Sequence, residues 1–192
     1  MPSDATITVL AALRLEALAI GGEVVCTGMG HAKAGATGTR LAASLPPGRP
    51  LAIVGIAGGL EPSLEPGQLV VADSLLPPDG AEPIALAHAQ AMAVALRSIG
   101  RHVVVGAVAC STSIVHGAAR TDLARSGALA VEMESVWLAR SLLDHPLAVV
   151  RAVGDTERHG FVFGNLKALA ALRHLRPALD QWARDIGPVT PN

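Results

Sequence analysis

Apolar residues follow two alternating patterns along the chain, one typical of buried strands and the other of amphipathic helices. Short runs rich in Val, Ala, Ile and Leu predict strands at 5–10, 23–27, 51–56, 68–72, 102–109, 128–131 and 147–153. The stretches between them predict helices at 13–20, 31–44, 82–99, 118–126 and 132–143, and a closing helix at 166–186 that bends or breaks near Pro177. This alternation predicts an α/β fold with three layers, α/β/α, around a largely parallel (mixed) central sheet.

The length of 192 residues fits one domain, which we place at 1–187, with a flexible tail at 188–192. Hydrophobic residues make up 51% of the chain, but Gly, Pro or a charge interrupts each apolar run before it is long enough to span a bilayer. The first residues include Asp4 and Glu16 and no basic n-region, so they predict a strand and a helix rather than a signal peptide. We therefore expect a cytoplasmic protein without stable membrane insertion.

The net charge and the absence of several motifs argue against a number of ligands and enzyme classes. A formal net charge of −1 argues against nucleic acid, because binding to phosphate backbones needs a clustered basic surface. Cys26 and Cys110 lie outside any CxxC motif and the histidines show no HExxH-like spacing, so we predict no metal site and no cofactor. The absence of GxGxxG, Walker and GxSxG motifs leaves a dehydrogenase, a sugar-phosphate or NTP binder and a serine hydrolase without specific support.

Four polar or glycine-rich clusters follow predicted strands. They are GMG at 28–30, AGGL at 57–60, EMES at 132–135 and RAVGDTERHG at 151–160. Ligands in such folds bind at the carboxyl ends of the strands, so we expect these clusters to form the site. Glycines there let the backbone approach a ligand closely, and their N–H groups, like a helix N-terminus, bind anions.

Carboxylates in these clusters are the candidates for chemistry. Asp155 follows a strand of Val and Ala, where burial would keep it protonated as a general acid; a helix N-cap or turn aspartate is the alternative. Glu134 is placed to accept two hydrogen bonds from a vicinal diol such as the ribose 2′- and 3′-hydroxyls, with Met133 packed on the sugar. Glu132 also fits an acidic first helical turn that complements the helix dipole.

Together, and in this order, the clusters resemble the nucleoside phosphorylase and nucleosidase superfamily. That family includes purine nucleoside phosphorylases, uridine phosphorylases and methylthioadenosine/S-adenosylhomocysteine nucleosidases. The resemblance covers nearly the whole chain, from ITVLAALRLEA (7–17) to VVRAVGDTE (149–157). Its specific part is the combination of the AGGL segment, AVEMES and VVRxxxD, since each piece alone is common. It implies an enzyme that cleaves the N-glycosidic bond of a purine nucleoside of the adenosine type.

The resemblance also implies a role for each matched residue. Asp155 would protonate or hydrogen-bond N7 of the departing purine, which permits an oxocarbenium-like transition state. Glu16 would position the attacking water, and Arg151 would lie near the nucleophile; a buried Arg151 needs a partner, for which Glu16 and Glu134 are candidates. The substrate-binding positions are Glu134, Met133 and Glu132 at the ribose, Ile114 and Val115 at the purine, and Ile56, Gly58 and Gly59 beside the nucleophile.

The departures from the family pattern concern the phosphate site. Phosphorylases of the bacterial hexameric type carry an arginine and a serine where this chain has Ile53 and Ile56. The usual serine before the acid is Gly154. A hypothetical replacement phosphate site consists of Arg14, Gly28 and Gly30. The sequence leaves the nucleophile open between water and inorganic phosphate, the latter as a co-substrate.

The chain is short for this family, which affects how the 5′ side of the substrate would be covered. Little chain separates Val71 from Glu82 to cover the 5′ side of the ribose, and an open, aliphatic 5′ side suits a bulky apolar substituent. GIAGGLEPSLEPG (55–67) looks most similar to the hopanoid-associated phosphorylase branch, whose members remove adenine from adenosylhopane. Hydrolysis of a methylthioadenosine- or futalosine-type nucleoside is an alternative, and so is nucleoside binding without turnover. Family members often assemble, so we expect a homo-oligomer.

Overall fold

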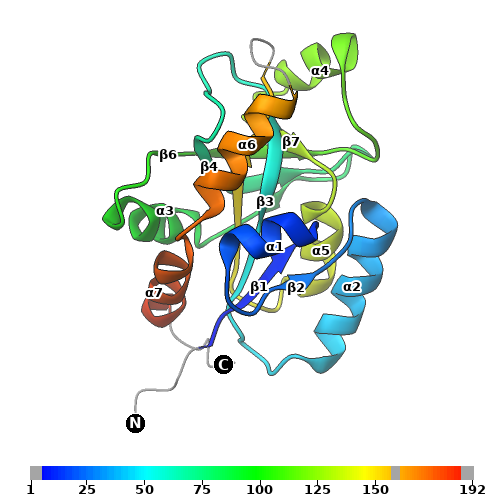
Figure 1. The fold of residues 1–192 in the computed structure, drawn as a ribbon. Coiled ribbons are helices and arrows are strands. Elements are labelled where there is room, and N and C mark those ends of the chain that lie inside the picture. Colours follow the sequence, from blue (N-terminus) through cyan, green and yellow to red (C-terminus); the bar gives the residue numbers. More distant parts are fainter. Residues whose placement is uncertain (1–5, 157–160, 187–192) are drawn as a thin grey trace.

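The computed structural model describes residues 6–156 and 161–186 (Figure 1). The strands in these ranges are β1 (Thr8–Ala11), β2 (Val25–Cys26), β3 (Leu51–Gly59), β4 (Leu69–Leu76), β5 (Ile84–Ala85), β6 (Val103–Cys110), β7 (Ala130–Glu132) and β8 (Leu147–Val153). The helices are α1 (Arg14–Ile20), α2 (His31–Ser44), α3 (Ala89–Ser98), α4 (Gly117–Ala124), α5 (Ser135–Leu142), α6 (Phe161–Leu172) and α7 (Arg176–Ile186). The α/β fold with a mixed sheet is confirmed. The predicted tail at 188–192 lies outside the described residues.

Alternating side chains of the central strands pack against helices on both faces of the sheet. On one face, Ala52 and Val54 of β3 belong to a buried cluster with α3, α6 and α7, in which Trp182 is fully buried. On the other face, Leu51 and Ile53 belong to a cluster with α2 and α5. This period of two, with both faces apolar, explains why the strands read as almost continuous apolar runs.

The strand pairings close a ring. The strand order is β2-β1-β3-β7-β6-β4-β5, and β8 pairs parallel with β3 and antiparallel with β4. Near Gly58, β3 leaves β8 and pairs antiparallel with β7, with Gly58 opposite Val131. The ring runs in the order β3, β8, β4, β6, β7 and back to β3. It brings the ends of β3 and β8 next to β7, where Gly59 N donates a hydrogen bond to Asp155 O at 2.9 Å.

Two predicted helices are wrong in their extent. The helix expected at 82–99 begins only at Ala89, because Ile84–Ala85 instead form β5 against the edge of β4. The closing helix is two helices, α6 and α7, separated around His174, whose φ of 62° lies in the left-handed region. The break expected near Pro177 is confirmed, since α6 ends at Leu172 and α7 begins at Arg176. Pro177 itself occupies the first turn of α7, where its missing N–H costs no helical hydrogen bond.

Candidate active site

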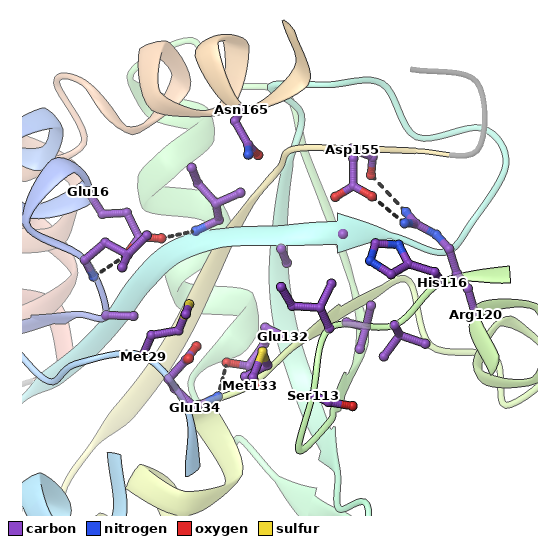
Figure 2. Close-up of a pocket in the computed structure, with 18 residues that line it drawn as sticks. Glu16, Met29, Ser113, His116, Arg120, Glu132, Met133, Glu134, Asp155 and Asn165 are labelled. Atoms are coloured by element: carbon purple, nitrogen blue, oxygen red, sulfur yellow. Dashed lines mark hydrogen bonds and ion pairs between the residues drawn. The ribbon is translucent and has the colours of Figure 1, made fainter. Parts of the chain in front are cut away.

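A pocket of about 190 Å³ lies where the ends of β3 and β8 meet β7. Figure 2 shows Asp155 and Arg120 at one end of the pocket and Glu16, Met29 and Glu134 at the other. Predicted site residues that line it are Glu16, Ile56, Gly58, Ile114, Val115, Glu132, Met133, Glu134 and Asp155. Further lining residues are Ala12, Leu13, Met29, Ala57, Ser113, His116, Arg120, Val131 and Asn165. The fold therefore brings most of the predicted site together.

Glu16 is buried and held by two backbone hydrogen bonds. Its Oε2 accepts a hydrogen bond from Leu13 N at 2.8 Å, which satisfies the N–H of the N-cap residue before α1, as the glutamate of a capping box does. Its Oε1 accepts one from Ile56 N at 2.8 Å, which ties α1 to β3. A Cβ atom at Gly55 would lie 2.8 Å from Glu16 Oε1, so only glycine permits this approach. The carboxylate is fixed in orientation and keeps further lone pairs for a water molecule.

Arg151 does not line the pocket. Its guanidinium forms an ion pair with Glu132, which does line the pocket, and donates a hydrogen bond to Ser135 Oγ at 2.8 Å. The prediction that Glu16 or Glu134 is the partner is therefore wrong. Burial acts to lower the pKa of Arg151, but the negative charges of Glu132, Glu134 and Glu16 outweigh it, so the pKa is raised. Arg151 neutralises a carboxylate cluster rather than facing the pocket.

Glu132 serves the start of α5. Its carboxylate accepts hydrogen bonds from Glu134 N at 3.0 Å and Ser135 N at 2.9 Å, two backbone donors at the start of this helix. This agrees with the interpretation of Glu132 as an acidic residue that complements the helix N-terminus. Its placement leaves the neighbouring Glu134 as the carboxylate that is free to face a ligand.

Glu134 is buried, and one of its oxygens is engaged. Its Oε1 accepts a hydrogen bond from Gly30 N at 2.8 Å, which links α5 to the loop before α2. Burial raises the pKa of Glu134, an effect that Glu132 reinforces and that the Arg151 charge opposes. The second oxygen, Oε2, receives no hydrogen bond from the described residues, so this carboxylate can accept one from a ligand.

Asp155 lies at the other end of the pocket, beside Arg120. The two form an ion pair, and their side chains are 21% and 10% exposed. The sequence predicts an acid surrounded by apolar groups; the structure instead gives the carboxylate a charged partner from α4. Gly58 leaves room for this arrangement, since a Cβ atom there would lie 3.4 Å from both Asp155 Oδ1 and Arg120 Nη2.

The remaining predicted residues lie outside the pocket wall. Arg14 is exposed, and neither it nor Gly28 lines the pocket. The Gly30 N–H is already donated to Glu134. Gly59 packs against Val153, where a Cβ atom would approach within 2.9 Å. The structure thus does not gather the hypothetical phosphate set at the pocket.

Several lining residues had no signal in the sequence. Arg120 lies in a short helix whose other charged residues are exposed, so nothing distinguished it from a surface arginine. His116 precedes α4 as its N-cap residue and also lines the pocket. Asn165 reaches the pocket from α6. Its contact with Gly154 depends on how α6 packs against the end of β8, which the sequence does not show.

Within 6–156 and 161–186, no group of three or more His, Cys, Asp or Glu side chains has the arrangement of a metal site. In the same ranges, no helix has the length and apolar character needed to cross a membrane.

The family is shown by comparison with known proteins. Residues 21–167 match the model of the phosphorylase superfamily, so the chain belongs to this family. The resemblance to the nucleoside phosphorylase and nucleosidase superfamily is thereby confirmed. No curated protein sequence matches the chain.

Solved structures with the same fold share little sequence with this chain. Native futalosine hydrolase from Helicobacter pylori has a TM-score of 0.77 at 20% identity, covering 91% of this chain and 97% of that one. The 5′-methylthioadenosine/S-adenosylhomocysteine nucleosidase from H. pylori, with butyl-thio-DADMe-Immucillin-A, has a TM-score of 0.76 at 20% identity, with coverage of 91% and 97%. The nucleosidase from Neisseria meningitidis, in complex with methylthio-immucillin-A, has a TM-score of 0.74 at 19% identity, with coverage of 94% and 97%.

Proposed function

We propose that this protein hydrolyses the N-glycosidic bond of a purine nucleoside of the adenosine type that carries an apolar 5′ group. The observation that carries the proposal is the placement of Glu16, Glu134 and Asp155 around one pocket in a chain of this family. Solved structures of the same fold include nucleosidases described with nucleoside analogues.

Each carboxylate has a distinct part in the reaction. Glu134 accepts hydrogen bonds from the ribose diol and fixes the sugar against Met133. Glu16 accepts a proton from the attacking water, whose oxygen bonds to C1′ as the C1′–N9 bond breaks. Asp155 reacts in its protonated form: it donates its proton to N7 of the purine, so that the base leaves as a neutral molecule and Asp155 is left ionised. Glu16 is left with the proton taken from water, and proton exchange with solvent restores both carboxyl groups. One water is consumed, and the products are the free base and the free sugar.

The charges around the pocket support water as the nucleophile. The ionisable lining residues other than histidine are Glu16, Glu132, Glu134, Asp155 and Arg120. The single arginine of this set is paired with Asp155, and Arg151 behind the wall is paired with Glu132. A phosphate dianion next to Glu16 and Glu134 would be repelled, because the described lining residues include no arginine or lysine that is free of a carboxylate partner. Water has no such cost, and it can donate a proton to Glu16.

Three exposed apolar side chains at the pocket support a 5′-apolar substrate. Leu13, Met29 and Ile114 line the pocket and are nevertheless 41%, 53% and 58% exposed. An apolar group extending from the ribose would cover these side chains, and each buried CH₂ would contribute about 0.8 kcal/mol. Both an alkylthio group and the lipid chain of an adenosylhopane-type nucleoside are apolar and could cover these side chains. The cytoplasmic location and the homo-oligomer stay predictions.

Adenine release is the measurement that tests the proposal. Adenosine, 5′-methylthioadenosine and a 5′-hexylthio analogue are each incubated with the protein, with and without inorganic phosphate, and the sugar product is identified. We expect phosphate-independent release of adenine, with the free sugar as co-product and kcat/KM rising with the length of the 5′ group. Asp155→Asn should lower kcat by about 10²- to 10⁴-fold while nucleoside binding persists.

Three results would contradict parts of this proposal separately. Release that requires phosphate and gives a sugar 1-phosphate would overturn hydrolysis but leave the N-glycosidic cleavage intact. Equal kcat/KM values for all three nucleosides would overturn the role of Leu13, Met29 and Ile114. Tight nucleoside binding without release of base from any substrate, inosine and futalosine included, would instead indicate a binding protein without turnover.

A further inference from the structure

Arg120 makes contacts with Asp155 that exceed an ordinary surface ion pair. Its Nη1 pairs with Asp155 Oδ2, and its Nη2 donates hydrogen bonds to the carbonyl oxygens of Asp155 at 3.0 Å and Gly59 at 2.6 Å. One guanidinium thus holds both the backbone and the side chain of Asp155 and joins them to the end of β3. Because guanidinium is planar and rigid, this set of bonds fixes the orientation of the carboxylate as well as its position.

The arrangement leaves one carboxylate oxygen of Asp155 for a ligand. Oδ2 is occupied by Arg120, whereas Oδ1 receives no hydrogen bond from the described residues. Figure 2 shows one Asp155 oxygen on the side away from Arg120, above the end of β3. Gly58 has no side chain to cover it, and the nearest Cβ position there is 3.4 Å from Oδ1.

Arg120 also connects this carboxylate to an apolar wall of the pocket. It lies one helical turn after His116, and the preceding segment contains Ile114 and Val115, all of which line the pocket. Arg120 therefore links this apolar wall to the carboxylate. Nothing else among the described residues bonds the Asp155 side chain, so the link depends on this one arginine.

We propose that Arg120 is a positioning residue that holds Oδ2 of Asp155 so that Oδ1 faces N7 of the purine. The inference rests on the proposed function, in which Asp155 hydrogen-bonds the departing base. Arg120 itself does not touch the reacting atoms: its Nη atoms are used by Asp155 and Gly59, and it acts through Asp155.

A double-mutant cycle tests the proposal. We compare Arg120→Met and Arg120→Lys in the wild-type protein and in the Asp155→Asn background, and we determine kcat and KM for 5′-methylthioadenosine. Arg120→Met should lower kcat at least about tenfold while KM changes less than about threefold, since the loss lies in the transition state. Lysine should restore part of kcat, because it supplies the charge without the two-nitrogen geometry.

The Asp155→Asn background separates positioning from general damage. There, Arg120→Met should lower the residual kcat by less than about twofold, because the carboxylate through which Arg120 acts is already absent. Arg125→Met is the matched control: Arg125 follows α4, is exposed and, among the described residues, has Asp122 as its one ion-pair partner, so its removal should leave kcat and KM unchanged. Equal losses in both backgrounds, or a change confined to KM, would overturn the inference.

A binding measurement keeps the inference testable if Arg120→Met folds poorly or if the protein releases no base. Arg120→Lys is compared with wild type by titrating adenine in a calorimeter, again with and without Asp155→Asn. A loss of adenine affinity in the Asp155 protein alone supports positioning even where hydrolysis fails. The same loss in both backgrounds overturns positioning while leaving hydrolysis, if observed, intact. Failure of wild type both to bind adenine and to release base from any of the nucleosides would overturn both proposals.

Discussion

Arg151 and Glu132 form an ion pair whose two side chains are each 1% exposed, and Glu132 also lines the pocket. The pair is also the support of the start of α5, since the same Glu132 carboxylate accepts hydrogen bonds from Glu134 N and Ser135 N. Through this pair the position of Glu134 depends on a residue of β8. A buried charge pair of this kind is stable only while both members are present.

The first prediction concerns this pair. Arg151→Met should destabilise the fold by about 3–5 kcal/mol, because it leaves the Glu132 carboxylate buried without its cation. Arg151→Met combined with Glu132→Gln should lose less, since no unpaired charge remains. The free energy of unfolding in urea checks both variants. A single variant that is as stable as wild type would contradict the role given to this pair.

The second prediction concerns Glu134 and the ribose diol. Glu134→Ala should weaken binding of adenosine by about tenfold or more while leaving 2′,3′-dideoxyadenosine almost unaffected, since a hydrogen bond to a charged group contributes about 1.5–3 kcal/mol. Equilibrium titration of both ligands gives the comparison. Equal weakening of both would show that Glu134 does not contact the diol.

The same residue predicts a pH dependence. Because burial raises the pKa of Glu134, its carboxylate takes up a proton at a higher pH than an exposed glutamate. The ionised form is the better acceptor for two hydroxyls, so adenosine affinity should fall as the pH is lowered through this raised pKa and recover above it. The dideoxy ligand is the control and should show no such fall. A titration with identical pH profiles for the two ligands would rule out this assignment.

The third prediction concerns the nucleophile. Glu16→Gln should lower kcat for hydrolysis by about 10²- to 10⁴-fold with little change in nucleoside affinity, because the amide cannot accept the proton of the attacking water. It should also cost some stability: Leu13 N and Ile56 N both donate to this side chain, and an amide has only one accepting oxygen. Single-turnover rates and a thermal unfolding midpoint separate the two effects. A retained hydrolysis rate would exclude Glu16 as the base.

Local patterns predicted where the long strands lie, because most of their residues are apolar and buried, although β8 contains the charged Arg151 and β4 the exposed Asp73. The strand β8 was predicted to the residue, at Leu147–Val153. Helix limits were less predictable: the apolar residues near Ile84 look helical in sequence, but their backbone groups bond to the exposed edge of β4. That choice depends on a tertiary neighbour, which no local pattern contains.

The site was predictable where a residue sits at a strand end and unpredictable where it reaches the pocket from elsewhere. Glu134 and Asp155 follow β7 and β8, and parallel or neighbouring strand ends meet in space. Arg120 enters from α4, and its role arises from the ring of strands that brings Gly59 beside Asp155. The partner of Arg151 was misjudged because Glu132 and Glu134 are only two residues apart and both line the pocket, so the sequence does not show which of them meets the guanidinium.

The last prediction concerns the contact between the end of β8 and α6. Gly154 stands where the family usually has a serine, and a Cβ atom there would overlap Asn165 Oδ1 and lie 2.8 Å from Ile56 Cγ2. Gly154→Ala should therefore destabilise the fold by about 1–3 kcal/mol. Asn165→Ala in the same chain should recover part of this, because the obstructing atom belongs to a side chain that can be removed.

Gly164 and Gly35 are the control positions for Gly154→Ala. A Cβ atom at Gly164 would overlap the Gly154 carbonyl, which is backbone and cannot be truncated, so Asn165→Ala should not rescue Gly164→Ala. Gly35 lies inside α2 with open space at its Cβ position, and Gly35→Ala should instead stabilise the fold by about 0.5–1 kcal/mol. Urea unfolding of these variants decides the matter. If Asn165→Ala restored the stability of both Gly154→Ala and Gly164→Ala, or of neither, the amide of Asn165 would not occupy the place of the missing serine side chain.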